Sequence, residues 1–176
     1  MCSTTIRKSF TAVPFQWKAG NGVLSSLSVQ PVYTMTEKQQ QEKQQQIDQT
    51  MTAVLTSMPA GLDAYGQVKY VYDYVIDHTD YVLDSPDNQN ICSVFLNGES
   101  VCQGYAKATQ YLLKKLGFEV TLIFGTEQTG ADHVWNLVKV DGDYYYMDTT
   151  WGEMQFSDQG ESKGINYNFL LITTEE

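Results

Sequence analysis

The chain has 176 residues and 42% hydrophobic side chains, which is enough for one domain with a sizeable core. Its formal net charge is −10, from 11 basic and 21 acidic residues, and it has no Lys/Arg cluster. This balance argues against nucleic acid or an anionic membrane as a partner. No stretch approaches the roughly 20 consecutive apolar residues of a membrane span, so we expect no span.

The N-terminal segment is expected to be an extension rather than part of the domain core. Residues 6–33 are polar and lean towards β-structure, with a turn expected at residues 20–22. We therefore expect residues 1–33 to form a short extension packed on the domain, and residues 34–176 to form the domain itself.

Two helices are expected next. Residues 37–55 are rich in glutamine, glutamate and lysine, which are good helix formers, so a solvated helix is favoured over a disordered linker. Pro59 and Gly61 break this helix, and residues 62–77 resume the helical period. The face of the second helix that should pack on the core contains Tyr65, Val68, Tyr72, Val75 and Ile76.

The three cysteines are too few for a disulfide framework, and their spacing does not suit zinc. Cys92 lies in the apolar run 91–96, where a free cysteine usually behaves as a small buried core residue. Cys2 fits the lipid attachment site of a bacterial protein that is secreted or held at the cell surface. A residue left by cloning explains it equally well, so the compartment stays open. The acidic residues show no calcium-loop spacing, so neither a metal ion nor a cofactor is expected.

A third helix is expected to begin close to Cys102. Apolar and small residues recur at helical spacing up to Leu116, and Gly117 follows where a left-handed C-terminal cap belongs. Ser100 and Gln103 fit the capping-box pattern, which places Cys102 in the first turn. Unpaired amides and the positive end of the helix dipole favour an anion there, so the pattern predicts a nucleophilic thiolate.

The rest of the chain predicts an antiparallel sheet of about four strands. The strands are expected at residues 119–124, 133–140, 143–148 and 167–172. A loop at residues 153–164 is expected near the rim of the site. With helices first, the sheet last and the cysteine helix packed on the sheet, the predicted fold class is α+β.

A hairpin brings a histidine and an aspartate together. Asp141-Gly142 is a strong signal for a two-residue turn, in which Val140 pairs with Asp143. In that register His133 and Asp148 lie one diagonal step apart on the same face, within reach of a hydrogen bond. A three-residue loop would place them on opposite faces. His78 is the alternative base, but its place at a helix end favours a capping or surface role.

Three motifs resemble the core of the transglutaminase-like superfamily. They are Gly98-Glu99-Ser100-Val101-Cys102-Gln103-Gly104-Tyr105-Ala106, His133-Val134-Trp135-Asn136 and Tyr146-Met147-Asp148-Thr149-Thr150-Trp151. The resemblance is clear over residues 91–172 and weaker back to residue 33. It implies a papain-like α+β fold with a Cys-His-Asp triad, and it favours a bacterial member of the family.

The resemblance implies acyl transfer or amide hydrolysis on a protein or peptide substrate, through a thioester at Cys102. His133 would act as the base, and Asp148 would orient it. Water as the acceptor gives hydrolysis and an amine gives transfer, so the three residues leave the choice between peptidase, deamidase and transglutaminase open. Because the superfamily includes members without activity, the alternative is a non-catalytic binding or scaffold module of a bacterial surface protein.

Further site residues are expected around the triad. The backbone amide of Cys102 is one natural donor to an oxyanion. The candidates for the second donor are Asn97, Gln103 and Tyr81. Gln103 is also a candidate for substrate binding, as are Trp135 and Trp151, which flank the histidine and aspartate motifs and could wall the site or pack in the core.

Overall fold

The computed structural model describes four stretches of the chain: residues 10–12, 14–33, 35–154 and 164–173. The chain divides into two compact units, Met1–Gln46 and Ile47–Glu176. Each unit has its own internal packing and is described by itself. The packing of residues 1–33 on the domain stays a prediction.

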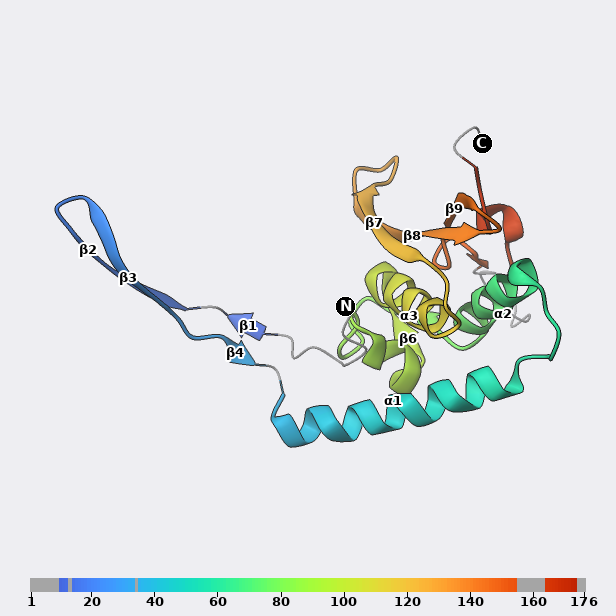
Figure 1. Ribbon diagram of the computed structural model, residues 1–176, viewed down its shortest axis with the longest axis horizontal. Coiled ribbons are helices and arrows are strands. Elements are labelled where there is room, and N and C mark those ends of the chain that lie inside the picture. The colour runs from blue at the N-terminus through green and yellow to red at the C-terminus, as the bar shows by residue number, and fades with distance from the viewer. Residues whose placement is uncertain (1–9, 13, 34, 155–163, 174–176) are drawn as a thin grey trace. The chain divides into compact units, whose positions relative to one another are not determined.

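Within its described residues, the first unit has four strands that pair antiparallel in two ribbons (Figure 1). The pairs are β1 (Phe10–Ala12) with β4 (Val32–Tyr33), and β2 (Phe15–Gly20) with β3 (Val23–Val29). The turn between β2 and β3 has positive φ at Asn21 and Gly22, 51° and 75°, as a two-residue hairpin turn requires. The turn expected at residues 20–22 is confirmed.

One face of the β2–β3 ribbon presents large apolar side chains to solvent. Phe15 lies opposite Val29 and Trp17 opposite Leu27, and each of the four is about half exposed or more. A two-stranded ribbon buries little apolar surface by itself. Nearly all of the described apolar core therefore lies in the second unit.

The glutamine-rich segment forms the predicted helix, α1 (Glu37–Ser57). Its start has a capping box, because Thr36 N donates to Gln39 Oε1 over 2.8 Å and Gln39 N donates to Thr36 Oγ1 over 3.2 Å. The apolar positions Ile47 and Met51 are buried in its second half. None of the helices in the described stretches combines the length and apolar content that a membrane crossing needs.

The second predicted helix is α2 (Ala64–Asp77), capped by Asp63, whose carboxylate accepts from Gly66 N over 2.8 Å. The buried side chains are Val68, Val71, Tyr72, Val75 and Ile76. The prediction was wrong for Tyr65, which is half exposed in the first turn, while Val71 joins the buried face instead.

The third helix, α3 (Cys102–Lys115), ends as predicted at Gly117, whose φ is +93°. Before it, a short π-helix η1 (Ser93–Asn97) buries the apolar run, and Cys92 is 1% exposed, as expected of a core cysteine. Two short parallel strands, β5 (Asp80–Tyr81) and β6 (Glu99–Ser100), lead into α3.

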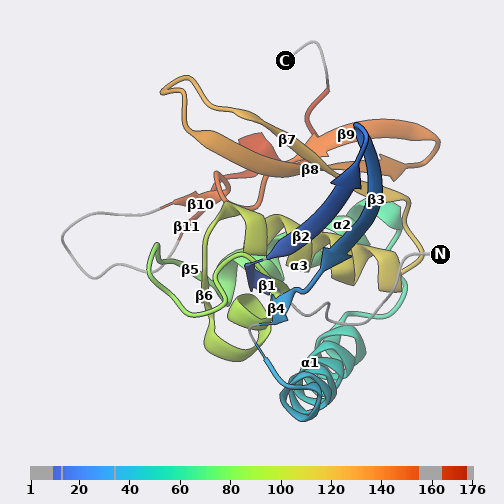
Figure 2. The same ribbon diagram turned by 90° about the vertical axis from the view of Figure 1, so that its left-hand side faces the viewer.

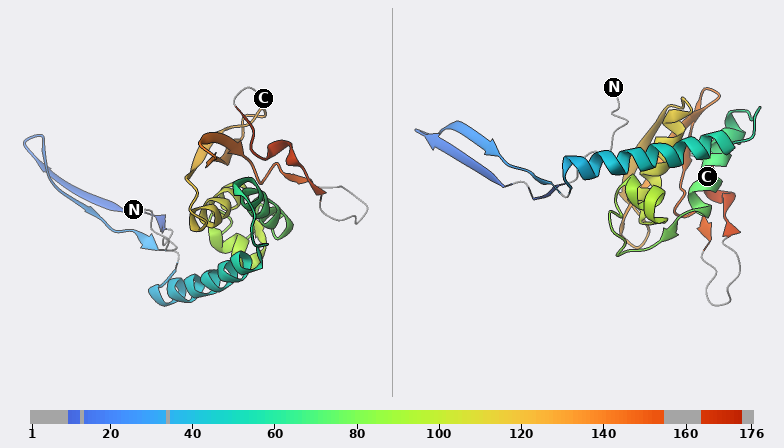
Figure 3. Two further views of the ribbon diagram at one scale, coloured as in Figure 1. Left: turned by 45° about the vertical axis from the view of Figure 1, so that its right-hand side comes forward. Right: turned by 90° about the horizontal axis from the view of Figure 1, so that it is seen from below.

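The sheet beside α3 is antiparallel, in the order β7 (Val120–Thr126), β8 (Asp132–Val140) and β9 (Asp143–Met147) (Figure 2). Alternate residues of β8 are buried, and one of them, Asn136, donates from Nδ2 to the carbonyl of Ala106 in α3 over 3.0 Å. Helix α3 packs on β7 and β8, and α2 packs on α3 (Figure 3). The α+β fold with the cysteine helix on the sheet is confirmed.

The predicted strand at residues 167–172 is wrong. Tyr167–Phe169 forms a 3₁₀ turn, η2, because the side chain of Asn166 accepts from Asn168 N over 3.0 Å and caps it. Within the described residues, a single bridge, between Ile172 and Tyr146, continues the sheet past β9. The predicted rim loop is bounded by paired strands β10 (Glu153–Met154) and β11 (Gly164–Ile165), and residues 155–163 lie outside the described stretches.

Gly104→Ala is expected to lower the free energy of unfolding by about 1–3 kcal/mol, because a side chain at this position would overpack the start of helix α3. A Cβ at Gly104 would lie 2.9 Å from the carbonyl oxygen of Asn88 and closer still to Ser100 Oγ. This clash should exceed the helix preference of alanine, about 1 kcal/mol. Urea unfolding checks it, with Lys115→Ala on the exposed last turn of α3 as the near-neutral control. Equal stability of Gly104→Ala and wild type would show that Asn88 and Ser100 leave room for a side chain at this position.

Candidate active site

Cys102 is the first residue of α3. Val101 is the N-cap residue, and its carbonyl accepts from Gly104 N over 2.9 Å and from Tyr105 N over 3.2 Å. The cysteine is a free thiol and is half-buried. It therefore has the expected place, where the first amides of the helix and its dipole favour an anion.

The predicted capping box is wrong, because Val101 caps α3 without any side-chain hydrogen bond. Ser100 is fully buried, and its hydroxyl lies 2.7 Å from the carbonyl oxygen of Asn88 and 2.7 Å from Ser93 Oγ. Ser100 thus holds the segment before Cys102 against Asn88 and Ser93, and it does not cap the helix. Sequence spacing could not distinguish these roles, because Asn88 and Ser93 come from the preceding loop and η1.

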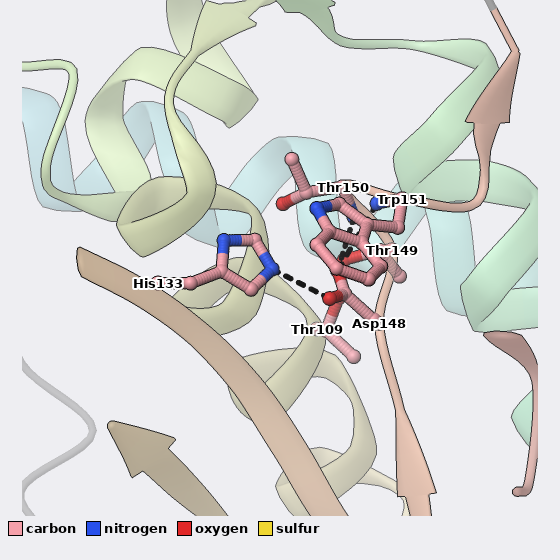
Figure 4. A network of polar contacts seen from close by, with 6 residues as sticks. All are labelled: Thr109, His133, Asp148, Thr149, Thr150 and Trp151. Carbon is pink, nitrogen blue, oxygen red and sulfur yellow. Dashed lines mark hydrogen bonds and ion pairs between the residues drawn. The ribbon is translucent and has the colours of Figure 1, made fainter. Parts of the chain in front are cut away.

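The histidine and the aspartate meet through the predicted hairpin. Asp141 and Gly142 have φ of 52° and 104°, and Val140 pairs with Asp143. His133 Nε2 lies 2.6 Å from Asp148 Oδ2, a contact drawn in Figure 4. The predicted register is confirmed, and it brings the imidazole and the carboxylate onto one face.

Asp148 is 7% exposed, and the second oxygen of its carboxylate also accepts hydrogen bonds. Oδ1 accepts from Thr150 N over 2.9 Å and from Trp151 N over 3.1 Å (Figure 4). Its own amide donates to the carbonyl of Phe169 over 2.9 Å. The carboxylate is therefore aimed at His133 by backbone amides as well as by the hairpin, which the sequence did not reveal.

The same segment is tied to the cysteine helix. Thr149 Oγ1 lies 3.2 Å from Thr109 Oγ1 of α3, and both threonines are buried. Tyr105 of α3 is fully buried, and its hydroxyl lies 2.7 Å from the carbonyl oxygen of Thr79 and 2.6 Å from Glu153 Oε2. The contacts with Thr149 and Glu153 link α3 to the residues that follow β9, and the contact with Thr79 links it to the end of α2.

His133 is 8% exposed and lies between two polar partners. Burial lowers the pKa of its ring, but hydrogen bonds to Asp148 and to the side chain of Cys102, together with their charges, raise the pKa from 6.5 to about 10. Because Nε2 contacts Asp148, the nitrogen that remains for the thiol is Nδ1. The imidazole of His133 thus contacts Asp148 and lies near enough to Cys102 for that side chain to raise its pKa.

Both predicted tryptophans contact the histidine ring. The centroid of the His133 ring is 5.8 Å from that of Trp135 and 5.2 Å from that of Trp151, and both indoles stack on it. Trp151 is 41% exposed and meets Phe169 edge-on at 5.3 Å. The indole of Trp135 lies over Gly125, where a Cβ would be 2.6 Å from it. The two indoles therefore cover the imidazole.

The remaining candidate site residues differ in their contacts. Gln103 is half-buried beside Cys102, and its role stays a prediction. Asn97 donates to the carbonyl of Pro86 over 3.2 Å, and the phenol of Tyr81 is hydrogen-bonded by the backbone amide of Cys102. His78 is exposed, stacks on Tyr74 and lies 2.9 Å from its carbonyl oxygen, as expected of a capping residue.

The family model described as the transglutaminase-like superfamily matches residues 52–149. This stretch is more than half of the chain, contains Cys102, His133 and Asp148, and stops one residue after the aspartate. The chain belongs to the transglutaminase-like superfamily. The family accounts for the fold seen here, in which a helix begins at a cysteine and packs on an antiparallel sheet.

Solved structures show the same fold. A structure described as a TGase aligns with a TM-score of 0.55 and 14% identity, over 84% of this chain and 46% of that one. A candidate cysteine protease from Cytophaga hutchinsonii aligns with a TM-score of 0.52 and 11% identity, over 83% of this chain and 65% of that one. The transglutaminase-like chain thus spans less than two thirds of the length of either protein. No curated protein sequence matches it.

The pH dependence of stability should show the coupling of His133 to its partners. Because its folded pKa of about 10 exceeds 6.5, protonation of the ring stabilises the fold fully below about pH 6.5, and this contribution disappears as pH rises through about 10. The difference in unfolding free energy between wild type and His133→Gln, measured in urea, should therefore shrink between these values. Cys102→Ala keeps the contact between His133 and Asp148, so the difference in unfolding free energy between wild type and this variant should change less with pH. A difference that is flat with pH would contradict the coupling.

Proposed function

We propose that the protein is a cysteine-dependent enzyme that transfers or hydrolyses an acyl group of a protein or peptide substrate, through a thioester at Cys102. The observation that carries the proposal is the buried His133, whose Nε2 lies 2.6 Å from Asp148 Oδ2 and whose pKa is raised by the side chains of both Asp148 and Cys102. A histidine with only a structural role has no need of a thiol on one side and an amide-fixed carboxylate on the other.

The residues suit the first half of an acyl-transfer reaction. A protonated His133 beside the sulfur pairs with the thiolate, which attacks the substrate carbonyl carbon and forms the C–S bond. When the C–N bond breaks, the leaving amine takes its proton from the imidazolium. Asp148 keeps a proton on Nε2, so that Nδ1 is the nitrogen that exchanges protons with sulfur and amine.

The second half is release of the thioester. Water yields a carboxylic acid, and a primary amine yields a new amide. His133 would take the proton of either acceptor, so the proposal covers both outcomes. Transfer and hydrolysis are distinguished by product analysis.

A labelling experiment tests the activated thiol. At pH 6 an ordinary thiol is almost wholly protonated, so iodoacetamide should modify Cys102 faster than free cysteine. Cys92 is 1% exposed and should react only in urea, and Cys2 should react more slowly than Cys102. If Cys102 reacts no faster than Cys2 or free cysteine, the thiol is not activated and the proposal fails.

A second experiment tests acyl transfer. The wild-type protein is offered a glutamine-containing peptide with a labelled primary amine, and separately a general peptide library. Mass spectrometry should find an acyl adduct on Cys102 and either amidated or cleaved product. If Cys102 is alkylated rapidly yet forms no adduct with any donor, the chain is better described as a binding or scaffold module.

A further inference from the structure

Tyr81 is held next to the cysteine by the backbone. In the parallel pairing of β5 with β6 it lies opposite Ser100, two residues before Cys102. Main-chain hydrogen bonds to the same neighbouring segment flank Tyr81, because Asp80 N donates to the carbonyl of Gly98 over 2.8 Å and Val82 N donates to that of Ser100 over 2.9 Å. The position of the Tyr81 backbone relative to the start of α3 is therefore set by main-chain hydrogen bonds.

The phenol of Tyr81 reaches the first amide of α3. The backbone N–H of Cys102 donates to the phenol oxygen, and the ring lies 6.3 Å from that of Tyr105, one turn further along the helix. Burial and then the charge of Cys102 raise the pKa of Tyr81 above its usual 10, which outweighs the lowering by the amide. At neutral pH the oxygen thus accepts from the amide while its own O–H remains available.

We propose that Tyr81 supplies the second hydrogen-bond donor, beside the backbone amide of Cys102, to the oxyanion that forms on the substrate carbonyl oxygen when the Cys102 sulfur attacks. The proposal rests on the proposed acyl-transfer function. An oxygen that accepts from the Cys102 amide in the free protein occupies the place that a substrate oxyanion needs. The phenol of Tyr81 therefore lies at the oxyanion position, and its O–H is a hydrogen-bond donor there.

The step needs no proton from tyrosine. As the sulfur forms its bond to the carbonyl carbon, the C=O π electrons move to oxygen. That oxygen replaces the phenol as acceptor of the Cys102 N–H, and the phenol moves aside and donates its O–H to it. When the leaving group departs, the electron pair returns to the C=O bond and both donors are released with their hydrogens unchanged.

Of the three candidates for this donor, only Tyr81 contacts the relevant amide. Asn97 uses Nδ2 for the carbonyl of Pro86 over 3.2 Å. Gln103 follows Cys102 in the helix, and no contact with the Cys102 amide is found for it within the described residues. The three could not be ranked from the sequence, because β5 is brought to α3 only by its pairing with β6.

Two reactions of the same sulfur separate this role from a structural one. With p-nitrophenyl acetate, the sulfur forms the acetyl thioester through an oxyanion and expels p-nitrophenolate with the electron pair of the broken C–O bond. With iodoacetamide, the sulfur displaces iodide directly and no oxyanion forms. Tyr81→Phe should slow acetylation about 10²-fold. Its alkylation rate and melting temperature should stay close to those of wild type.

Tyr144→Phe is the matched control, because it removes a phenol of β9 that donates to Glu119 and lies outside the site. Acetylation of this variant should proceed at the wild-type rate. Equal slowing of acetylation and alkylation in Tyr81→Phe would make Tyr81 a residue that positions or ionises the thiol, and would overturn the proposal. Unchanged or faster acetylation would also overturn it. A wild-type protein that is alkylated but never acetylated would contradict the proposed function itself.

Discussion

Cys102→Ala is expected to abolish thioester formation, and His133→Ala to slow it by about 10⁴-fold or more, because neither side chain performs the reaction without the other. The double variant should then be no slower than Cys102→Ala alone. This non-additivity is the mark of a catalytic unit and is not expected of two unrelated polar side chains. Mass spectrometry of the acyl adduct and rates of product formation measure it.

Cys92→Ala is the matched control for this prediction. Cys92 is buried in the core, whereas Cys102 is half-buried at the helix start. Cys92→Ala should lower the melting temperature through the cavity that it leaves and preserve activity, and Cys102→Ala should do the reverse. If Cys102→Ala kept every activity of the wild type and lost several kcal/mol of stability, the cysteine would be structural.

Asp148→Asn is expected to slow thioester formation by about 10²- to 10⁴-fold, because it reverses the tautomer of His133. Asp148 Oδ1 accepts from two backbone amides, so in the variant the amide oxygen must stay on that side. The NH₂ group then faces Nε2 and donates to it. The ring proton is forced onto Nδ1, which can no longer take a proton from the thiol.

The loss should fall towards the lower end of this range, because a thiol transfers its proton to histidine more readily than a hydroxyl does. The alkylation rate of Cys102 at pH 6 should decline together with acylation. Asp73→Asn removes another half-buried carboxylate, paired with Lys69 over 2.5 Å in α2, and is the control that should keep both rates. Wild-type rates in Asp148→Asn would show that the carboxylate does not orient the histidine.

Local patterns in the sequence were sufficient for the parts of the fold that depend on near neighbours. The Asp141-Gly142 turn set the register of β8 and β9, since a two-residue turn leaves one pairing of the flanking strands. Helix α3 and its end at Gly117 followed from periodicity and from the need for positive φ.

Errors occurred where a residue had alternatives that only packing could decide. Ser100 has the spacing of a capping residue, but its hydroxyl is used by Asn88 and Ser93 from earlier in the chain. Residues 167–172 are apolar enough for a strand, yet Asn166 caps a 3₁₀ turn there. Because such hydrogen bonds compete on nearly equal terms, spacing alone does not predict which one forms.

The sequence by itself determined the three helices and the strands β7, β8 and β9 in their order, the hairpin register and the three residues that the family motifs pick out. Only the tertiary structure decided that the backbone amides of Thr150 and Trp151 aim Asp148, and that Trp151 covers His133. It also decided that Tyr81 meets the amide of Cys102. The physical reason is range: turns and helix ends depend on residues a few positions apart, whereas these contacts exist only once separate segments have packed together.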